Sequence, residues 1–216
     1  MRNEFNHELE ELGALLTEMA GAAENAIDVV TASLTDPNRE AADQALAITK
    51  NMDRMERDIE NRCLKLLLRQ QPVAHDLRTI SAALQMVTDL QRIGDQCANI
   101  AEMSRLFAGR GALLRLEKIR SMAQKAAAMV KQAIAAYVTR DADAAGRVVE
   151  LDDDVDDLFL TVKKELVERM VENRSEADQA IDLIIIAKYL ERIADHAVNI
   201  AQWATYCVTG EIQPTN

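Results

Sequence analysis

The stretch Asp89–Glu102 reads DLQRIGDQCANIAE, and one hundred residues later Tyr189–Gln202 reads YLERIADHAVNIAQ. The two stretches share Leu, Arg, Ile, Asp, Asn, Ile and Ala in the same register. Identity at this density indicates an internal duplication covering roughly half of the chain. We therefore expect two equivalent units, residues 1–109 and 110–210, followed by a short tail at 211–216.

Apolar residues in both stretches recur at the spacing of an α-helix. In the second stretch they lie three and four residues apart and share one face at about 100° per residue, at Leu190, Ile193, Ala197 and Ile200. The first stretch repeats this stripe with Leu90, Ile93, Cys97 and Ile100. Both stripes are predicted to be core. A polar ladder of Glu191, Asp195 and Asn199 is predicted on the outward face.

The composition is typical of long helices, with 3% aromatic residues, seven glycines and three prolines. Turn signals near 35–38, Pro72, 109–111, Arg140–Asp141 and 172–175 divide the chain. They predict helices over about 4–34, 39–71, 73–108, 113–139, 142–171 and 176–209, with Gly210 as the final stop. Short connections make neighbouring helices antiparallel. The predicted fold is all-α, with six long helices forming two pseudo-symmetric antiparallel three-helix bundles.

Bulk properties exclude several classes of protein. A net charge of −11 and a pI near 4.8 argue against nucleic acid or an anionic membrane as the main partner. No apolar run approaches the ~20 residues that span a bilayer. The acidic N-terminus does not resemble a signal peptide, so we expect a cytoplasmic protein. No nucleotide-binding, nucleophile or zinc-hydrolase motif is present, and a protein that is not an enzyme is predicted.

The densest run of acids is Glu150–Asp157, within the predicted helix 142–171. If that helix lies beside the last one, four carboxylates line one groove: Asp152, Asp156, Glu191 and Asp195. Oxygen ligands of this kind suit hard or borderline cations such as magnesium, manganese, calcium or iron. In the alternative interpretation, Lys188 and Arg192 neutralise the acids locally and the ladder faces solvent.

The first half carries a reduced version of this constellation. Thr49 stands at the position equivalent to Asp152, and the hundred-residue offset places Gln91 where the second half has a glutamate. Asp53 and Asp95 remain, with Glu56, Glu60 and Glu102 nearby in the sequence. Because the number of charged ligands sets cation affinity, the first-half site is predicted to be the weaker one.

The doubled motif, together with QPVAHDLR at Gln71–Arg78, resembles the PhoU family of bacterial phosphate-uptake regulators. The resemblance covers nearly the whole chain. It implies two three-helix bundles, often dimeric, that act as a negative regulator of the phosphate-starvation response. It also implies an adaptor between the ATPase subunit of the phosphate ABC transporter and a phosphate-sensing histidine kinase. Some family members bind multinuclear metal clusters through paired E(D)xxxD motifs.

Carried onto this sequence, the family motif is complete in the second half, at Asp152, Asp156, Glu191 and Asp195. It lacks the leading acid of each pair in the first half, where Asp53 and Asp95 remain. The resemblance thus implies bound divalent or trivalent metal, such as iron, zinc, manganese or magnesium. Asp76 and Arg78 match the family's DLR, where an ion pair fixing the turn after Pro72 is expected. Two alternatives stay open: a metal-dependent hydrolase at the acidic groove, and a purely structural helical dimer.

Overall fold

The computed structural model describes residues 2–35, 39–70, 74–107 and 117–211, which are almost entirely helical. The elements are α1 (Arg2–Thr35), α2 (Arg39–Gln70), α3 (Ala74–Phe107), α4 (Glu117–Thr139), α5 (Ala142–Glu150), α6 (Asp152–Glu172), the 3₁₀ turn η1 (Arg174–Glu176) and α7 (Ala177–Thr209). No strand occurs in these ranges, so the prediction of an all-α fold is confirmed.

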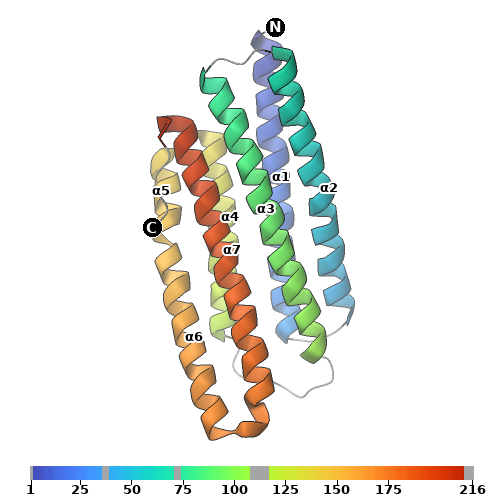
Figure 1. Ribbon diagram of the computed structural model, residues 1–216, viewed down its shortest axis with the longest axis vertical. Helices are drawn as coiled ribbons and strands as arrows, with labels where there is room; N and C mark the ends of the chain where they lie inside the picture. Colours follow the sequence, from blue (N-terminus) through green and yellow to red (C-terminus); the bar gives the residue numbers. More distant parts are fainter. Residues whose placement is uncertain (1, 36–38, 71–73, 108–116, 212–216) are drawn as a thin grey trace.

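The helices form two antiparallel three-helix bundles that lie side by side (Figure 1). Helices α1, α2 and α3 make up one bundle, and α4, α7 and the α5–α6 pair make up the other. Between the bundles, α3 packs along α7 and α1 packs along α4. The two copies of the repeated motif, on α3 and α7, therefore face each other across the middle of the molecule.

The prediction of one continuous helix over 142–171 is wrong in detail, because the structure divides it at Leu151 into α5 and α6. Leu151 keeps right-handed helical angles, with φ −73° and ψ −17°. Its N–H donates to the carbonyl oxygens of both Arg147, at 3.3 Å, and Val148, at 3.2 Å. The backbone tightens locally toward a 3₁₀ pattern without a chain break. No proline or glycine marks the position, so the sequence carried no signal for it.

Two predicted helix ends are confirmed. Arg140 ends α4 in the left-handed region, with φ 57°, and Asp141 begins α5 by accepting a hydrogen bond from the Ala144 N–H at 2.8 Å. Gly210, with φ 80°, closes α7 by donating its N–H to the Tyr206 carbonyl at 2.9 Å. The predicted turns at 36–38 and Pro72, the 109/110 boundary and residues 212–216 of the tail lie outside the described residues.

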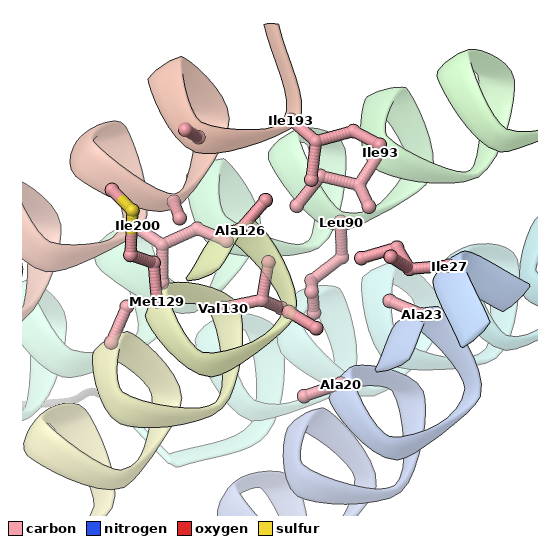
Figure 2. Packing of buried hydrophobic residues seen from close by; sticks show 14 of the residues in the cluster. Ala20, Ala23, Ile27, Leu90, Ile93, Ala126, Met129, Val130, Ile193 and Ile200 are labelled. Carbon is pink, nitrogen blue, oxygen red and sulfur yellow. The ribbon is translucent and has the colours of Figure 1, made fainter. Parts of the chain in front are cut away.

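The buried side chains form one hydrophobic cluster that includes residues from both halves. Every member of the two predicted apolar stripes is buried, Cys97 included. Figure 2 shows Ile93 of α3 beside Ile193 of α7, and Leu90 of α3 extending from them toward Val130 of α4 and Ile27 of α1. Complete burial of one such side chain stabilises a fold by about 1.5–3 kcal/mol. The stripes thus hold the two bundles together.

Candidate functional site

The four acids of the predicted acidic groove lie on α6 and α7, which pack directly against each other. Asp152 begins α6 and is half-buried, while Asp156 lies one turn later on the same helix and is exposed. On α7, the Glu191 side chain is only 12% exposed, and Asp195 follows one turn later with an exposed side chain. The helix pairing on which the predicted groove depends is therefore present.

Electrostatic effects show that these acids act on one another. Burial raises the pKa of Asp152 to about 6, and repulsion from Asp156 and then Asp195 adds to the rise. Burial also raises the pKa of Asp156, with Glu191 as the next contributor. The pKa of Asp195 is raised by burial and by Asp156, while Lys188 acts in the opposite direction. Each carboxylate thus lies within the field of another from the opposite helix.

Nearby positive charges neutralise only some of these carboxylates. Lys188 Nζ forms a salt bridge with Glu191 Oε2 and also lies 5.4 Å from the ring centroid of Phe159. Local neutralisation by Lys188 is therefore real for Glu191. Asp152 differs in having no salt bridge with the described residues, and its Oδ1, like Glu191 Oε2, is buried and accepts no hydrogen bond. A buried charged oxygen without a partner is costly, and a cation or a proton would relieve that cost.

The side chains do not form a closed ligand sphere as they stand. Within the described ranges, no three His, Cys, Asp or Glu side chains come close enough together to hold a metal ion. The donor set is nonetheless made only of carboxylate oxygens, which suits hard cations. The groove therefore has the chemistry of a cation site, in an open arrangement with Lys188 inside it.

In the first half, an amide and an arginine side chain form hydrogen bonds and a salt bridge with the equivalent acids. Gln91 Nε2 donates to Asp95 Oδ1 at 2.9 Å and lies 3.5 Å from Asp53 Oδ1 on the neighbouring helix α2. Arg92 also pairs with the second oxygen of Asp95, at 3.2 Å. The Thr49 hydroxyl donates to the Leu46 carbonyl at 3.1 Å. The amide that replaces a glutamate thus acts as an internal donor between the two remaining acids.

Burial raises the pKa of Glu56, with further contributions from Glu60, Asp53 and Asp95, which places Glu56 at the edge of this first-half cluster. The two halves of the molecule are therefore not equivalent. The second half brings together four mutually repelling carboxylates, and the first half holds carboxylates bridged by a neutral amide.

A polar pair between the halves was not anticipated from the sequence. His196 Nδ1 of α7 lies 2.9 Å from Asp89 Oδ1 of α3, and both side chains are largely buried, at 18% and 15% exposed. Asn199 Nδ2 donates to the same oxygen at 3.3 Å. Tyr189 occupies the position equivalent to Asp89 in the second copy, so comparing the repeats gave no sign of an acid with a cross-helix role.

This contact corrects the prediction that Asn199 belongs to an outward ladder. Four residues turn a helix by about 400°, so each step of such a ladder advances by about 40°. Asn199 lies two such steps after Glu191. Its side chain therefore points toward α3, whereas the Glu191 side chain lies on the side of α7 that faces α6. His7, by contrast, is exposed beside Glu10 and Glu11.

The expected ion pair of the DLR segment does not form among the described residues. Neither Asp76 nor Arg78 has a salt bridge there, and Arg78 Nε is buried without a hydrogen-bond partner. Instead, the Arg78 guanidinium lies against Gly210, in space that a Cβ at that position would occupy. Cys207 Sγ lies 3.8 Å from the Arg78 carbonyl oxygen. Arg78 therefore contacts the end of α7.

None of the described helices is both long enough and apolar enough to cross a membrane.

Comparison with known proteins gives one consistent result. The PhoU domain model matches residues 16–104 and again residues 119–204. A phosphate-specific transport system accessory protein PhoU homolog of Clostridium acetobutylicum is 35% identical over 211 residues, covering 97% of this chain and 96% of that protein. The homolog from Pseudomonas aeruginosa is 34% identical over 208 residues, covering 96% and 86%.

Solved structures agree with these matches. The crystal structure of PhoU from Pseudomonas aeruginosa superposes with a TM-score of 0.90 at 34% identity, covering 96% of this chain and all of that one. The phosphate transport system regulatory protein PhoU from Streptococcus pneumoniae shares the fold, with a TM-score of 0.89 at 24% identity, covering 98% of this chain and all of that one. On its repeated motif, its helical fold and these matches, this chain belongs to the PhoU family.

Proposed function

We propose that this protein is a negative regulator of phosphate uptake and of the phosphate-starvation response. In this proposal it acts in the cytoplasm as a homodimeric adaptor between the ATPase subunit of a phosphate ABC transporter and a phosphate-sensing histidine kinase. The observation that carries the proposal is similarity over nearly the full length to proteins named as phosphate-specific transport system accessory proteins. The net charge of −11 suits basic partner surfaces.

We further propose that the second-half groove binds a divalent or trivalent metal, such as iron, manganese, magnesium or zinc. The residues that would hold it are Asp152, Asp156, Glu191 and Asp195. The partnerless Asp152 Oδ1 and the mutual repulsion among the acids support this proposal. A bound cation would supply the positive charge that offsets this repulsion. Lys188 would then compete with the metal for Glu191.

The first-half acids, Asp53 and Asp95, are proposed as a weaker site. The Gln91 amide already occupies their inner oxygens, and a metal would have to displace it. Two carboxylates also supply less charge than four, which lowers cation affinity. We therefore propose an asymmetric protein in which the site on α6 and α7 binds metal more tightly than the site in the first half.

Elemental analysis of the untagged protein tests the metal proposal, after incubation with iron, manganese, magnesium and zinc in turn. Metal retained by the wild type should be lost in Asp195→Ala and largely kept in Asp95→Ala, which removes the equivalent acid from the first half. Metal absent from the wild type, or lost equally in both variants, contradicts the assignment to the second-half groove.

Affinity capture tests the adaptor proposal separately. The transporter ATPase subunit and the cytoplasmic part of the kinase should each be retained by the wild-type chain. The double variant Glu191→Ala, Asp195→Ala should lose this retention while keeping its helical circular dichroism. Asp157→Asn removes one charge from the exposed face of α6 and serves as the matched control. If the folded wild type retains neither partner, the adaptor proposal is wrong.

A further inference from the structure

A second polar site lies away from the acidic groove, where the ends of α1, α3 and α4 meet. It is an open groove of about 500 Å³ whose polar lining includes Asn6, Glu10, His75, Asp76, Thr79 and Arg140. The groove straddles the two halves, because α4 belongs to the second bundle while α1 and α3 belong to the first. It contains Asp76 of the QPVAHDLR segment, a motif that the acidic groove does not use.

Asp76 is the unusual member of this lining. Its residue surface is only 6% exposed, and its carboxylate forms no hydrogen bond or salt bridge with the residues that the structure describes, while its oxygens are not fully enclosed and border the groove. Burying a carboxylate without a partner works against folding. A buried acid that lines a groove in this state has unused capacity for a positively charged hydrogen-bond donor.

The repeat provides an internal comparison. Glu176 occupies the position one hundred residues later, just before α7. Its Oε1 accepts a hydrogen bond from Asn173 Nδ2 at 2.9 Å, and its Oε2 lies 3.9 Å from Arg169 Nε. The second copy therefore gives its acid one hydrogen bond and a long ion pair while leaving Oε2 buried without a hydrogen bond, whereas Asp76 lines a groove with neither kind of contact among the described residues.

A structural role at the start of α3 accounts for part of this observation. An acid in the first turn of a helix is favoured by the helix dipole. That effect requires a negative charge near the helix end and is equally available to an exposed side chain. It does not explain why Asp76 is buried in the groove wall, nor why no donor among the described residues meets it.

The basic residues of the lining leave Asp76 unpaired. Arg140 and His75 both border the groove, and neither lies within salt-bridge distance of the Asp76 carboxylate. Arg140 is held at the rim by its left-handed backbone, which is fixed between the end of α4 and the Asp141 cap of α5. Glu10 adds a second negative charge at the exposed edge.

We propose that this groove binds a guanidinium or ammonium group, with Asp76 as the buried anion that receives it. The group could be carried by an arginine or lysine side chain of a protein segment or by a free basic amino acid, and the two sources share the same chemistry. As a contact for a protein segment, the site rests on the proposed adaptor role. It does not depend on metal in the acidic groove.

The test is an amide NMR titration of the full chain with two probes. One is a five-residue peptide with a central arginine between alanines and with both ends blocked, and the other is L-arginine. Shifts are expected at Thr79, Val138 and their neighbours. A peptide that binds at least tenfold more tightly than L-arginine assigns the site to a protein segment, and the opposite order assigns it to a free amino acid. The same peptide carrying uncharged citrulline should not bind.

Variants decide whether Asp76 receives the probe. Asp76→Asn should weaken binding at least tenfold, while Glu176→Gln, the matched change in the second copy, should bind as the wild type does. Val138→Lys places an ammonium group on an exposed residue of the groove and should block binding even if Asp76→Asn fails to fold. Shifts that are absent, or that are unchanged in Asp76→Asn and Val138→Lys, overturn the proposal. Because no partner protein or metal is present, either outcome leaves the proposed adaptor role to its own experiment.

Discussion

Replacing Asp152 by asparagine should stabilise the metal-free protein near pH 8. The pKa of Asp152 rises from its ordinary value of 3.8 to about 6 in the folded chain. At 1.36 kcal/mol per pKa unit, the charged form costs the folded state about 3 kcal/mol. Asp152 is only half-buried, so solvent screening reduces this figure to roughly half. Losing a negative charge at the start of α6 removes up to about 0.5 kcal/mol of helix-dipole stabilisation. The expected net gain is about 1 kcal/mol.

The effect of Asp152 on stability depends on pH. A carboxyl whose pKa is higher in the folded state than in the unfolded one stabilises the fold fully below the unfolded value. That stabilisation is lost as the pH rises through the folded value. The advantage of the asparagine variant should therefore be present at pH 8, shrink through about pH 6 and vanish by about pH 4. Urea denaturation of both proteins at each pH, with a chelator present, measures the difference directly.

A second measurement with metal present and a control variant complete the experiment. With saturating manganese the proposed metal site predicts the reverse order, because Asp152→Asn removes one of its four ligands. Asp157→Asn removes a charge from the exposed side of the same helix and should change stability by no more than about 0.5 kcal/mol. A variant that is less stable than the wild type at pH 8 in chelator would refute the argument that Asp152 is a strained, uncompensated charge.

Three further predictions concern charges elsewhere. Lys188→Met should tighten metal binding up to about fivefold by calorimetric titration, because a half-exposed competing cation is worth about 0.2–1 kcal/mol. The double change Thr49→Asp, Gln91→Glu should raise the metal content per chain by elemental analysis, while lowering metal-free stability by about 1–2 kcal/mol because the amide bridge is lost. His196→Ala should cost about 1–3 kcal/mol in urea denaturation, because it removes a donor from the buried carboxylate of Asp89.

Each of these has a result that would count against it. Unchanged metal affinity in Lys188→Met would mean that the lysine does not compete for the groove. No additional metal in the first-half double variant would show that charge count alone does not explain the asymmetry. For the cross-bundle pair, His7→Ala is the control because that side chain is exposed. Equal losses of stability in His196→Ala and His7→Ala would contradict a stabilising role specific to His196.

The periodic apolar stripes made most of the fold predictable. Ile93 and Ile193 were expected in the core from spacing alone, and both are fully buried. Such stripes are informative because a helix must bury its apolar face whatever its neighbours are. The ends at Arg140 and Gly210 were predictable for a related reason, since turn chemistry is local.

Other features depended on three-dimensional context. The division at Leu151 comes from a shift of backbone hydrogen bonds between two helical patterns, which no residue type specifies. The pairing of Asp89 with His196 required the knowledge that α3 lies against α7. The sequence also indicated that Gln91 replaces an acid, but not that its amide bridges Asp53 and Asp95. For the acidic groove, residue spacing predicted the four positions, whereas the Lys188 salt bridge depends on a side-chain rotamer.

The shared core limits how the duplicated gene product can be dissected. Because α3 and α7 press their apolar stripes against each other, either copy expressed alone would present Ile93 or Ile193 to water. Such a fragment would self-associate through the bared stripe or recruit its missing partner in trans. Split versions of the chain should therefore work only as complementing pairs. A tag or insertion tolerated by one copy would still be sensed by the other through their common interior.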